Sequence, residues 1–204
     1  LIGLMQQGQQ IALITDAGTP GISDPGEELV RFCYEAGIEV TSLPGPAACI
    51  TALTLSGLST RRFCFEGFLP TDKKERQVVL ERLKKETRTT VFYEAPHRLL
   101  KTLPLLIEAA GEDRKVFRAT LGEAYAYYQA NEPKGEIVLV LEGVSQKKLD
   151  EEQQQSWESM SIEDHMALYM SQGLQKKEAM KRVAADRGVT KRDIYQYLVD
   201  CKDE

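Results

Sequence analysis

Short apolar runs alternate with amphipathic stretches along the first two thirds of the chain. Runs rich in β-branched and aromatic residues predict strands, and apolar positions at helical spacing predict helices between them. We expect strands at 11–15, 38–43, 63–65, 89–93, 115–119 and 137–142. We expect helices at 27–37, 47–56, 96–110 and 121–129, and a charged helix ending at Lys85 and capped by Thr71 or Asp72. The strand–loop–helix order at 11–56 indicates a parallel sheet with right-handed crossovers, so the fold class is α/β.

The pattern changes after Gly143. Residues 145–158 are polar, include three consecutive Gln, and are typical of a linker. Residues 161–200 contain three short helical patterns, with Gly173 and Gly188 between them and Ser161 and Thr190 as expected caps. The last two, 176–187 and 191–199, are also compatible with a helix-turn-helix, although many short helix pairs share that pattern.

These patterns divide the chain into four parts. We expect a partial N-terminal α/β domain at 1–57 and a second α/β domain at 58–144. A linker at 145–160 and a small helical appendage at 161–204 follow.

Composition narrows the class of protein. The chain has 204 residues, 42% of them hydrophobic, which is enough for a buried core. No stretch approaches the roughly 20 apolar residues of a membrane span. The four cysteines form no CxxC pair and the two histidines lie far apart, so we expect no metal site. Cys33, Cys49 and Cys64 have apolar neighbours and are expected to be buried free thiols of a cytoplasmic protein.

The charge is unevenly distributed. The formal net charge of −5 is unusual for a protein that binds nucleic acid. Residues 73–118 nevertheless carry twelve Lys or Arg against seven acids, and residues 174–192 carry seven against two. Such regions can present basic faces to phosphate or can be solvated helix faces, and composition alone favours the second interpretation.

The segment from Asp16 to Gly26 carries the strongest sign of ligand binding. It is a long loop of mostly Gly, Pro, Asp, Ser and Thr directly after an apolar run. Its glycines allow positive φ and close approach of the backbone, but they form neither a GxGxxG motif nor a phosphate loop. A dinucleotide-binding or nucleotide-hydrolysing enzyme is therefore disfavoured. The segment Pro44-Gly-Pro46-Ala-Ala48 admits either a flat ring or a tight corner.

Five segments in order carry a resemblance to a known family. They are 12–26 (ALITDAGTPGISDPG), 43–47 (LPGPA), 65–70 (FEGFLP), 92–98 (FYEAPHR) and 134–138 (KGEIV). Together they resemble the tetrapyrrole methylase family, in particular its branch of small-subunit ribosomal RNA methyltransferases. The resemblance covers about residues 1–144, with a compatible helical tail.

The resemblance implies a fold, a cofactor and a substrate. The fold is two α/β domains of tetrapyrrole-methylase type, with S-adenosyl-L-methionine between them. The substrate is a cytidine ribose in the decoding region of 16S rRNA, in the small ribosomal subunit, methylated at its 2′-hydroxyl by a homodimer. Cofactor contacts are implied for Ala17, Gly18, Thr19, Ile22, Ala47, Ala48 and Tyr93. RNA contacts are expected at Arg98, Lys73, Lys74 and Arg76.

The chain departs from the family pattern in two places. The family has a first strand, a GN-containing loop and an EDTR-like segment before the equivalent of Leu1. It also has an RELTK-like stretch where Arg118 and Ala119 are adjacent here. The resemblance therefore implies a first domain that is truncated at its N-terminus in this chain.

The sequence does not decide which residue is the general base. A ribose hydroxyl is a poor nucleophile, so a base is expected to assist it. His97 and Glu94 are the candidates, followed by Asp16, Asp24 and Glu66. His97 is equally compatible with a structural position at a helix start, and Glu94 with pairing to Arg98.

Two alternatives remain. A methylase of tetrapyrrole small molecules is one, although those relatives tend to carry a GDP-type loop where this chain has Gly18-Thr19-Pro20. The other is an interaction protein that keeps the fold without binding the cofactor.

Overall fold

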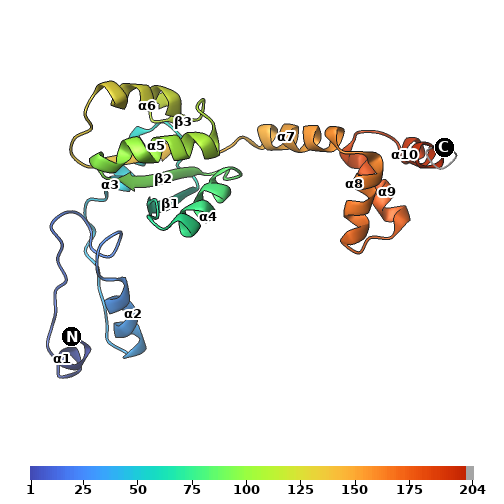
Figure 1. The fold of residues 1–204 in the computed structure, drawn as a ribbon. Helices are drawn as coiled ribbons and strands as arrows, with labels where there is room; N and C mark the ends of the chain where they lie inside the picture. The colour runs from blue at the N-terminus through green and yellow to red at the C-terminus, as the bar shows by residue number, and fades with distance from the viewer. Residues whose placement is uncertain (201–204) are drawn as a thin grey trace. The chain divides into compact units, whose positions relative to one another are not determined.

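A computed structural model describes residues 1–200, which fall into two compact units. Unit one comprises Leu1–Val144 and unit two begins at Ser145. Figure 1 shows the path of the chain through both units.

The core of unit one is a mixed five-stranded sheet with the order β1-β2-β5-β3-β4. Its strands are β1 (Phe63–Phe68), β2 (Thr89–Glu94), β5 (Ile137–Leu141), β3 (Lys115–Val116) and β4 (Ala119–Thr120). Only β1 and β2 pair in parallel, whereas the other neighbours are antiparallel. The prediction of an α/β fold is confirmed, whereas the parallel sheet expected for residues 11–56 is not formed among the described residues.

Helices cover both faces of this sheet because its central strands alternate their side chains. Val91 and Val140 face α3 (Ala48–Leu55), where they pack with Cys49 and Leu53. On the other face, Phe92, Leu139 and Leu141 join a larger core built with α4 (Lys73–Leu83), α5 (Pro96–Ala110) and α6 (Leu121–Ala130). Successive residues of a strand point to opposite faces, so apolar runs in β2 and β5 serve both layers.

The starts of α4 and α5 agree with the sequence signals. Asp72, rather than Thr71, caps α4, since its carboxylate accepts hydrogen bonds from the backbone N–H groups of Lys74 and Glu75. Pro96 occupies the first turn of α5. Because β1 and β2 run in parallel, the helices that follow them begin at the same edge of the sheet.

The strands predicted at 11–15 and 38–43 are wrong. Neither segment pairs with a strand among residues 1–200. Their apolar side chains are correspondingly open to solvent, with Ile14 85% and Leu43 83% exposed. Apolar composition favours a strand, but a strand forms only where a neighbour accepts its hydrogen bonds. The helices flanking these segments, α1 (Ile2–Gln6) and α2 (Glu27–Glu35), are present.

The strand predicted at 115–119 is instead a tight hairpin. Val116 pairs with Ala119, and the turn between them places Arg118 at φ +63°. That conformation is uncommon for a residue with a side chain. Arg118 also stacks its guanidinium on the ring of Phe117.

Unit two is entirely helical in its described part. It contains α7 (Gln146–Ser159), α8 (Ile162–Ser171), α9 (Lys176–Asp186) and α10 (Lys191–Asp200). The three helices predicted at 161–200 are confirmed, and Ser161 and Thr190 accept hydrogen bonds from backbone N–H groups of their first turns. Most of the segment expected to be a linker, at 145–158, is helical, because α7 occupies it. Residues 201–204 of the expected appendage lie outside the described residues.

The three expected cysteine thiols are free. Cys33 and Cys49 are buried, as predicted, whereas Cys64 is only half-buried. Cys64 lies in β1, an edge strand of the sheet order, where one side lacks a covering neighbour.

Candidate functional site

The loop at 16–26 meets the Pro44-Gly-Pro46 turn within unit one. Both the backbone N–H and the hydroxyl of Thr19 donate to the carbonyl oxygen of Pro46, at 3.1 and 3.2 Å. The loop and the turn approach each other closely, since a Cβ added to Gly18 would lie 3.2 Å from that oxygen. One added to Gly45 would lie 3.0 Å from Oγ1 of Thr19. Two segments separated along the sequence therefore form one structure.

The edge of the sheet joins the same structure through Tyr93. The backbone N–H of Cys49, in the first turn of α3, donates to the Tyr93 hydroxyl at 3.1 Å. The ring of Tyr93 packs edge-on against Phe65 and Phe68 of β1. Burial raises the pKa of Tyr93, the Cys49 thiol and the Asp24 carboxylate raise it further, and the hydrogen bond from the backbone N–H of Cys49 opposes this rise. The phenol therefore stays protonated at neutral pH.

A bulge in β1 brings the end of that strand close to the loop at 16–26. The ladder to β2 shifts register between Phe65 and Gly67, and Gly67 adopts φ +63°. A Cβ at Gly67 would lie 3.4 Å from the hydroxyl oxygen of Ser23, in the loop at 16–26. Ser23 itself adopts φ +59°. The loop thus lies against the turn that precedes α3 and approaches the end of β1.

The residues expected to bind a cofactor offer backbone groups and small side chains. Ala17, Gly18 and Ala48 are exposed, while Thr19 and Ala47 are half-buried. Ile22 is 45% exposed and supplies an apolar surface. Backbone polar groups beside an apolar side chain suit a ligand with a flat ring and polar ends, such as S-adenosylmethionine. The residues present therefore fit that group.

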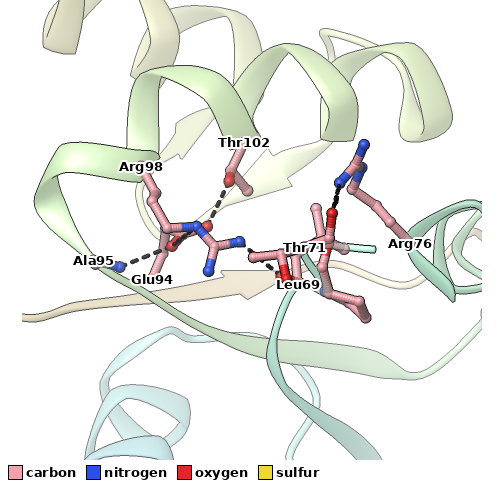
Figure 2. A network of polar contacts seen from close by, with 8 residues as sticks. Leu69, Thr71, Arg76, Glu94, Ala95, Arg98 and Thr102 are labelled. Carbon is pink, nitrogen blue, oxygen red and sulfur yellow. Dashed lines mark hydrogen bonds and ion pairs between the residues drawn. The ribbon is translucent and has the colours of Figure 1, made fainter. Parts of the chain in front are cut away.

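Glu94 lies in a closed network at the end of β2, shown in Figure 2. Its side chain is 1% exposed. One carboxylate oxygen accepts from the backbone N–H of Ala95 at 2.9 Å and lies 3.5 Å from Nε of Arg98. The other accepts from the hydroxyl of Thr102 at 2.5 Å. Each oxygen already has a donor, so this carboxylate holds α5 against the sheet and is poorly placed to take a proton from a substrate.

Two arginines fix the segment that follows β1. Arg98 donates to the carbonyl oxygen of Leu69 at 2.7 Å. Arg76, from α4, donates to the carbonyl oxygen of Thr71 at 2.8 Å and to that of Pro70 at 3.3 Å. Figure 2 shows both guanidinium groups reaching this segment from different helices. Lys73 and Lys74 are fully on the surface, in the first turn of α4.

The other candidate bases are more exposed to solvent than Glu94. His97 is exposed in the first turn of α5, next to Arg98. Asp16 is exposed and accepts a hydrogen bond from the hydroxyl of Thr15. Asp24 is half-buried, and Glu66 lies exposed at the β1 bulge. Of the two leading candidates, only His97 faces solvent at the edge of the sheet.

Sequence reasoning missed Thr102 and Ser23. Thr102 lies eight residues after Glu94, two helical turns into α5, and a buried Thr at that spacing was the available signal. Ser23 was hidden because its left-handed conformation is rare for a residue other than Gly.

Comparisons with known proteins agree with this geometry. The family model of Tetrapyrrole (Corrin/Porphyrin) Methylases matches residues 2–123. The chain belongs to the tetrapyrrole methylase family. This span contains the loop at 16–26, the Pro44-Gly-Pro46 turn and the ends of β1 and β2, so the resemblance predicted from five segments is confirmed.

Several relatives share a more specific name, ribosomal RNA small subunit methyltransferase I. One from Synechocystis is 43% identical, over 98% of this chain and 75% of its own length. Those from Bacillus subtilis and Escherichia coli O157:H7 are 41% and 40% identical, over 96% and 98% of this chain and 70% and 72% of their own lengths. The Synechocystis alignment runs over 213 positions, more than the 204 residues here, so that relative contains residues without a counterpart in this chain.

No helix within residues 1–200 combines the length and apolar character needed to cross a bilayer. In the same residues, no group of three or more His, Cys, Asp or Glu side chains is arranged to hold a metal ion.

Proposed function

We propose that this protein is an S-adenosyl-L-methionine-dependent methyltransferase that acts on ribosomal RNA. The finer proposal is 2′-O-methylation of a cytidine in the decoding region of 16S rRNA, within the small ribosomal subunit. The observation that carries it is the convergence of the loop at 16–26, the start of α3 and Tyr93 in a member of this family. Relatives at 40–43% identity are named for ribosomal RNA methylation, which supports the substrate class.

The proposed cofactor contacts follow from what each element presents. The backbone of Ala17, Gly18 and Thr19 supplies hydrogen-bonding groups, and Ile22 supplies an apolar contact. Ala47 and Ala48 leave room for a ring at the start of α3, and Tyr93 holds that start in place through Cys49. When bound, the cofactor supplies a methyl group already activated on a sulfonium sulfur. The protein's contribution is then to position the substrate oxygen.

The proposed RNA contacts lie at the same edge of the sheet. Lys73 and Lys74 begin α4, and His97 and Arg98 begin α5. Because α4 and α5 follow parallel neighbouring strands, Lys73, Lys74 and Arg98 lie in helix starts at the same edge of the sheet. Arg76 and Arg98 each use part of the guanidinium on backbone carbonyls, and the remaining N–H groups are proposed to bind phosphate. An rRNA substrate places the protein in the cytoplasm, and we propose a homodimer there.

His97 is the proposed general base. Its side chain is exposed at this edge, whereas Glu94 is enclosed by Ala95, Arg98 and Thr102. A neutral imidazole removes a proton from a ribose hydroxyl as the oxygen attacks the methyl carbon in line. His97→Gln is expected to lower the rate of transfer about 100-fold at saturating cofactor while leaving cofactor affinity unchanged.

The test uses this chain, tritiated S-adenosylmethionine and small ribosomal subunits from a strain that lacks the modification. Label in 16S rRNA at a cytidine ribose supports the proposal, and His97→Gln under the same conditions tests the base. Label on uroporphyrinogen or a precorrin, with none on rRNA, would favour the tetrapyrrole alternative. Absence of cofactor binding by calorimetry would favour an interaction protein on the same fold.

A further inference from the structure

The helices of unit two form a basic groove that lies outside the site described above. It measures about 610 Å³ and is lined by Lys176, Lys177, Met180, Lys191, Arg192 and Tyr195. Four of these six residues are cations, and no acidic side chain is among them. Four of the seven cations at 174–192 therefore line one groove, and the other three, Lys181, Arg182 and Arg187, are not part of it.

The architecture of unit two explains why the cations meet. Lys176 and Lys177 form the first turn of α9, and Lys191 and Arg192 form the first turn of α10. Ala179, Val183 and Ile194 pack α9 and α10 together with α8 through a shared core. Two helix N-termini thus lie beside one groove, and a helix N-terminus favours an anion.

The four cations of the groove remain exposed in the described part of the protein. In the part of the chain that the structure describes, none of the four forms an ion pair, and all four are exposed. The acids of unit two concentrate elsewhere, with six Asp or Glu against two Lys among residues 147–164. Asp193 is adjacent to Arg192 in sequence, but its carboxylate accepts from the backbone N–H and the hydroxyl of Thr190 at the cap of α10.

The groove also contains a planar surface. Tyr195 is 58% exposed beside the cations, and Met180 lies nearly buried beneath them. A groove of cations that tracks a phosphate backbone, with an aromatic ring on which a base can stack, is the arrangement that binds single-stranded nucleic acid. A membrane surface or an acidic protein would use the charges but would not need an exposed ring in the middle of them.

We propose that this groove is a second RNA-binding site, which holds a single-stranded segment of the substrate through its phosphates and one stacked base. The inference deepens the proposed function, since it takes RNA as the partner. It assigns unit two the task of increasing affinity for the substrate, while unit one carries out the transfer. On this proposal Tyr195 and the four cations contribute to substrate binding and not to the transfer step, so their loss raises KM and leaves kcat unchanged.

The binding test uses the full chain and a fluorescein-labelled single-stranded RNA of about 20 nucleotides, longer than the roughly 4–16 that one such site covers. Affinity is measured by anisotropy from about 50 to 300 mM KCl. Each phosphate contact on a single strand contributes a slope of about 0.7 in the logarithmic salt dependence. Two double variants each remove two of these cations: Lys176→Gln/Lys177→Gln and Lys191→Gln/Arg192→Gln. Each is expected to lower the slope of the logarithmic salt dependence by about 1.4. Each pair should also weaken binding about tenfold or more near 100 mM.

The matched control is Lys181→Gln/Arg182→Gln, which removes the same charge from the exposed surface of the same helix outside the groove. We expect it to change affinity less than twofold. Tyr195→Ala is expected to weaken binding at least fivefold, and Tyr195→Phe to retain it. Circular dichroism and the emission of Trp157 verify that each variant is folded.

Three results would overturn the inference. They are an unchanged salt slope in both groove pairs, an equal loss in the control pair, and tighter binding to phosphatidylglycerol vesicles than to RNA. The proposed function is judged separately by methyl transfer. If the groove variants and the starting protein methylate rRNA with the same KM, the groove proposal is wrong and the proposed function stands. If RNA binding depends on the groove but no methyl transfer occurs, the groove proposal stands and the proposed function is wrong.

Discussion

At the scale of single residues, the end of β2 shows how two neighbours acquire different tasks. Tyr93 and Glu94 are adjacent, so their side chains leave opposite faces of the sheet. Tyr93 faces α3 and holds the start of that helix, while Glu94 faces α5 and accepts from Thr102 and Ala95. The sequence suggested both residues as site candidates, and it could not separate them because their roles depend on which helix covers each face.

The Glu94 network is expected to stabilise unit one. Glu94→Ala leaves the buried Thr102 hydroxyl and the partly exposed Arg98 without their carboxylate, and losing a hydrogen bond to a charged group costs about 1.5–3 kcal/mol. Urea unfolding followed by circular dichroism measures the loss. Glu94→Gln keeps an acceptor oxygen and should lose less. The emission of Trp157, the only tryptophan and a residue of unit two, should give an unchanged transition in both variants.

Tyr93 is expected to matter for cofactor binding rather than for the core. Tyr93→Phe keeps the ring contacts with Phe65 and Phe68 but removes the acceptor for the N–H of Cys49. One hydrogen bond contributes about 1 kcal/mol, which corresponds to about a fivefold loss of S-adenosylmethionine affinity by calorimetry. Tyr34→Phe is the control, since Tyr34 is 85% exposed. Equal affinity in the two variants would remove Tyr93 from the proposed site.

At the scale of elements, sequence patterns were reliable where side chains decide the structure and unreliable where neighbours do. The starts of α4 and α5 could be predicted from Asp72 and Pro96, because each of these residues stabilises the first turn of its own helix. The segments 11–15 and 38–43 have apolar strand character but no strand neighbour among the described residues, which composition cannot reveal. The hairpin at Phe117-Arg118 lacks the Gly or Asn that usually marks such a turn.

Helix α7 shows that a polar segment can be regular. Its polar sequence is typical of a linker, and its Lys, Glu and Gln residues also have high helix propensity. Ser145 caps its first turn, and pairs at i,i+4 spacing, such as Lys147 with Glu151, line its surface. Polarity excludes a buried element, but it does not exclude a helix. A helix of this kind is stabilised locally, so the propensity of each residue was the better guide.

Because the loop at 16–26 packs against Pro46, alanine substitutions at two of its glycines are expected to change cofactor affinity differently. Gly18 and Gly21 adopt φ +76° and +85°, so alanine strains both positions by about 1 kcal/mol. A Cβ at Gly18 would also lie 3.2 Å from the Pro46 oxygen, whereas one at Gly21 meets nothing within 4 Å. Gly18→Ala should therefore lower S-adenosylmethionine affinity at least tenfold in calorimetry, and Gly21→Ala much less. Similar losses would mean that backbone strain alone governs the loop.

At the scale of the whole molecule, the two units have separate cores and separate sensitivities to pH. In unit one, the side chain of Arg88 donates to Glu86 and lowers the pKa of that carboxyl to about 2. Its stabilising contribution is complete above the ordinary value of 4.5 and is lost as the pH falls toward 2. In unit two, the titrating group nearest to neutral pH is His165, which is fully buried between the rings of Trp157 and Tyr169.

The surroundings of His165 favour its neutral form. Burial lowers its pKa, and the charge of Arg187, which donates to Nδ1 at 3.2 Å, lowers it further. Asp186 lies 3.4 Å from Nε2 and opposes this shift, but its carboxylate also accepts from the Tyr169 hydroxyl. Because the folded state binds the proton less readily than the unfolded state, stability is complete above the ordinary His pKa of about 6.5 and declines as the pH falls below it.

Unit two should consequently lose stability between pH 7.5 and 5.5 while unit one does not. One pH unit below the ordinary pKa, the loss reaches at most about 1.4 kcal/mol, or roughly 5 °C in the transition of a small unit. Trp157 emission reports unit two directly, and circular dichroism reports both units. His165→Asn keeps an acceptor for Arg187 and should remove the pH dependence of the Trp157 transition, whereas His97→Gln, at the chain's other histidine, should preserve it. A transition that shifts equally in His165→Asn and the starting protein would show that another group titrates with unfolding.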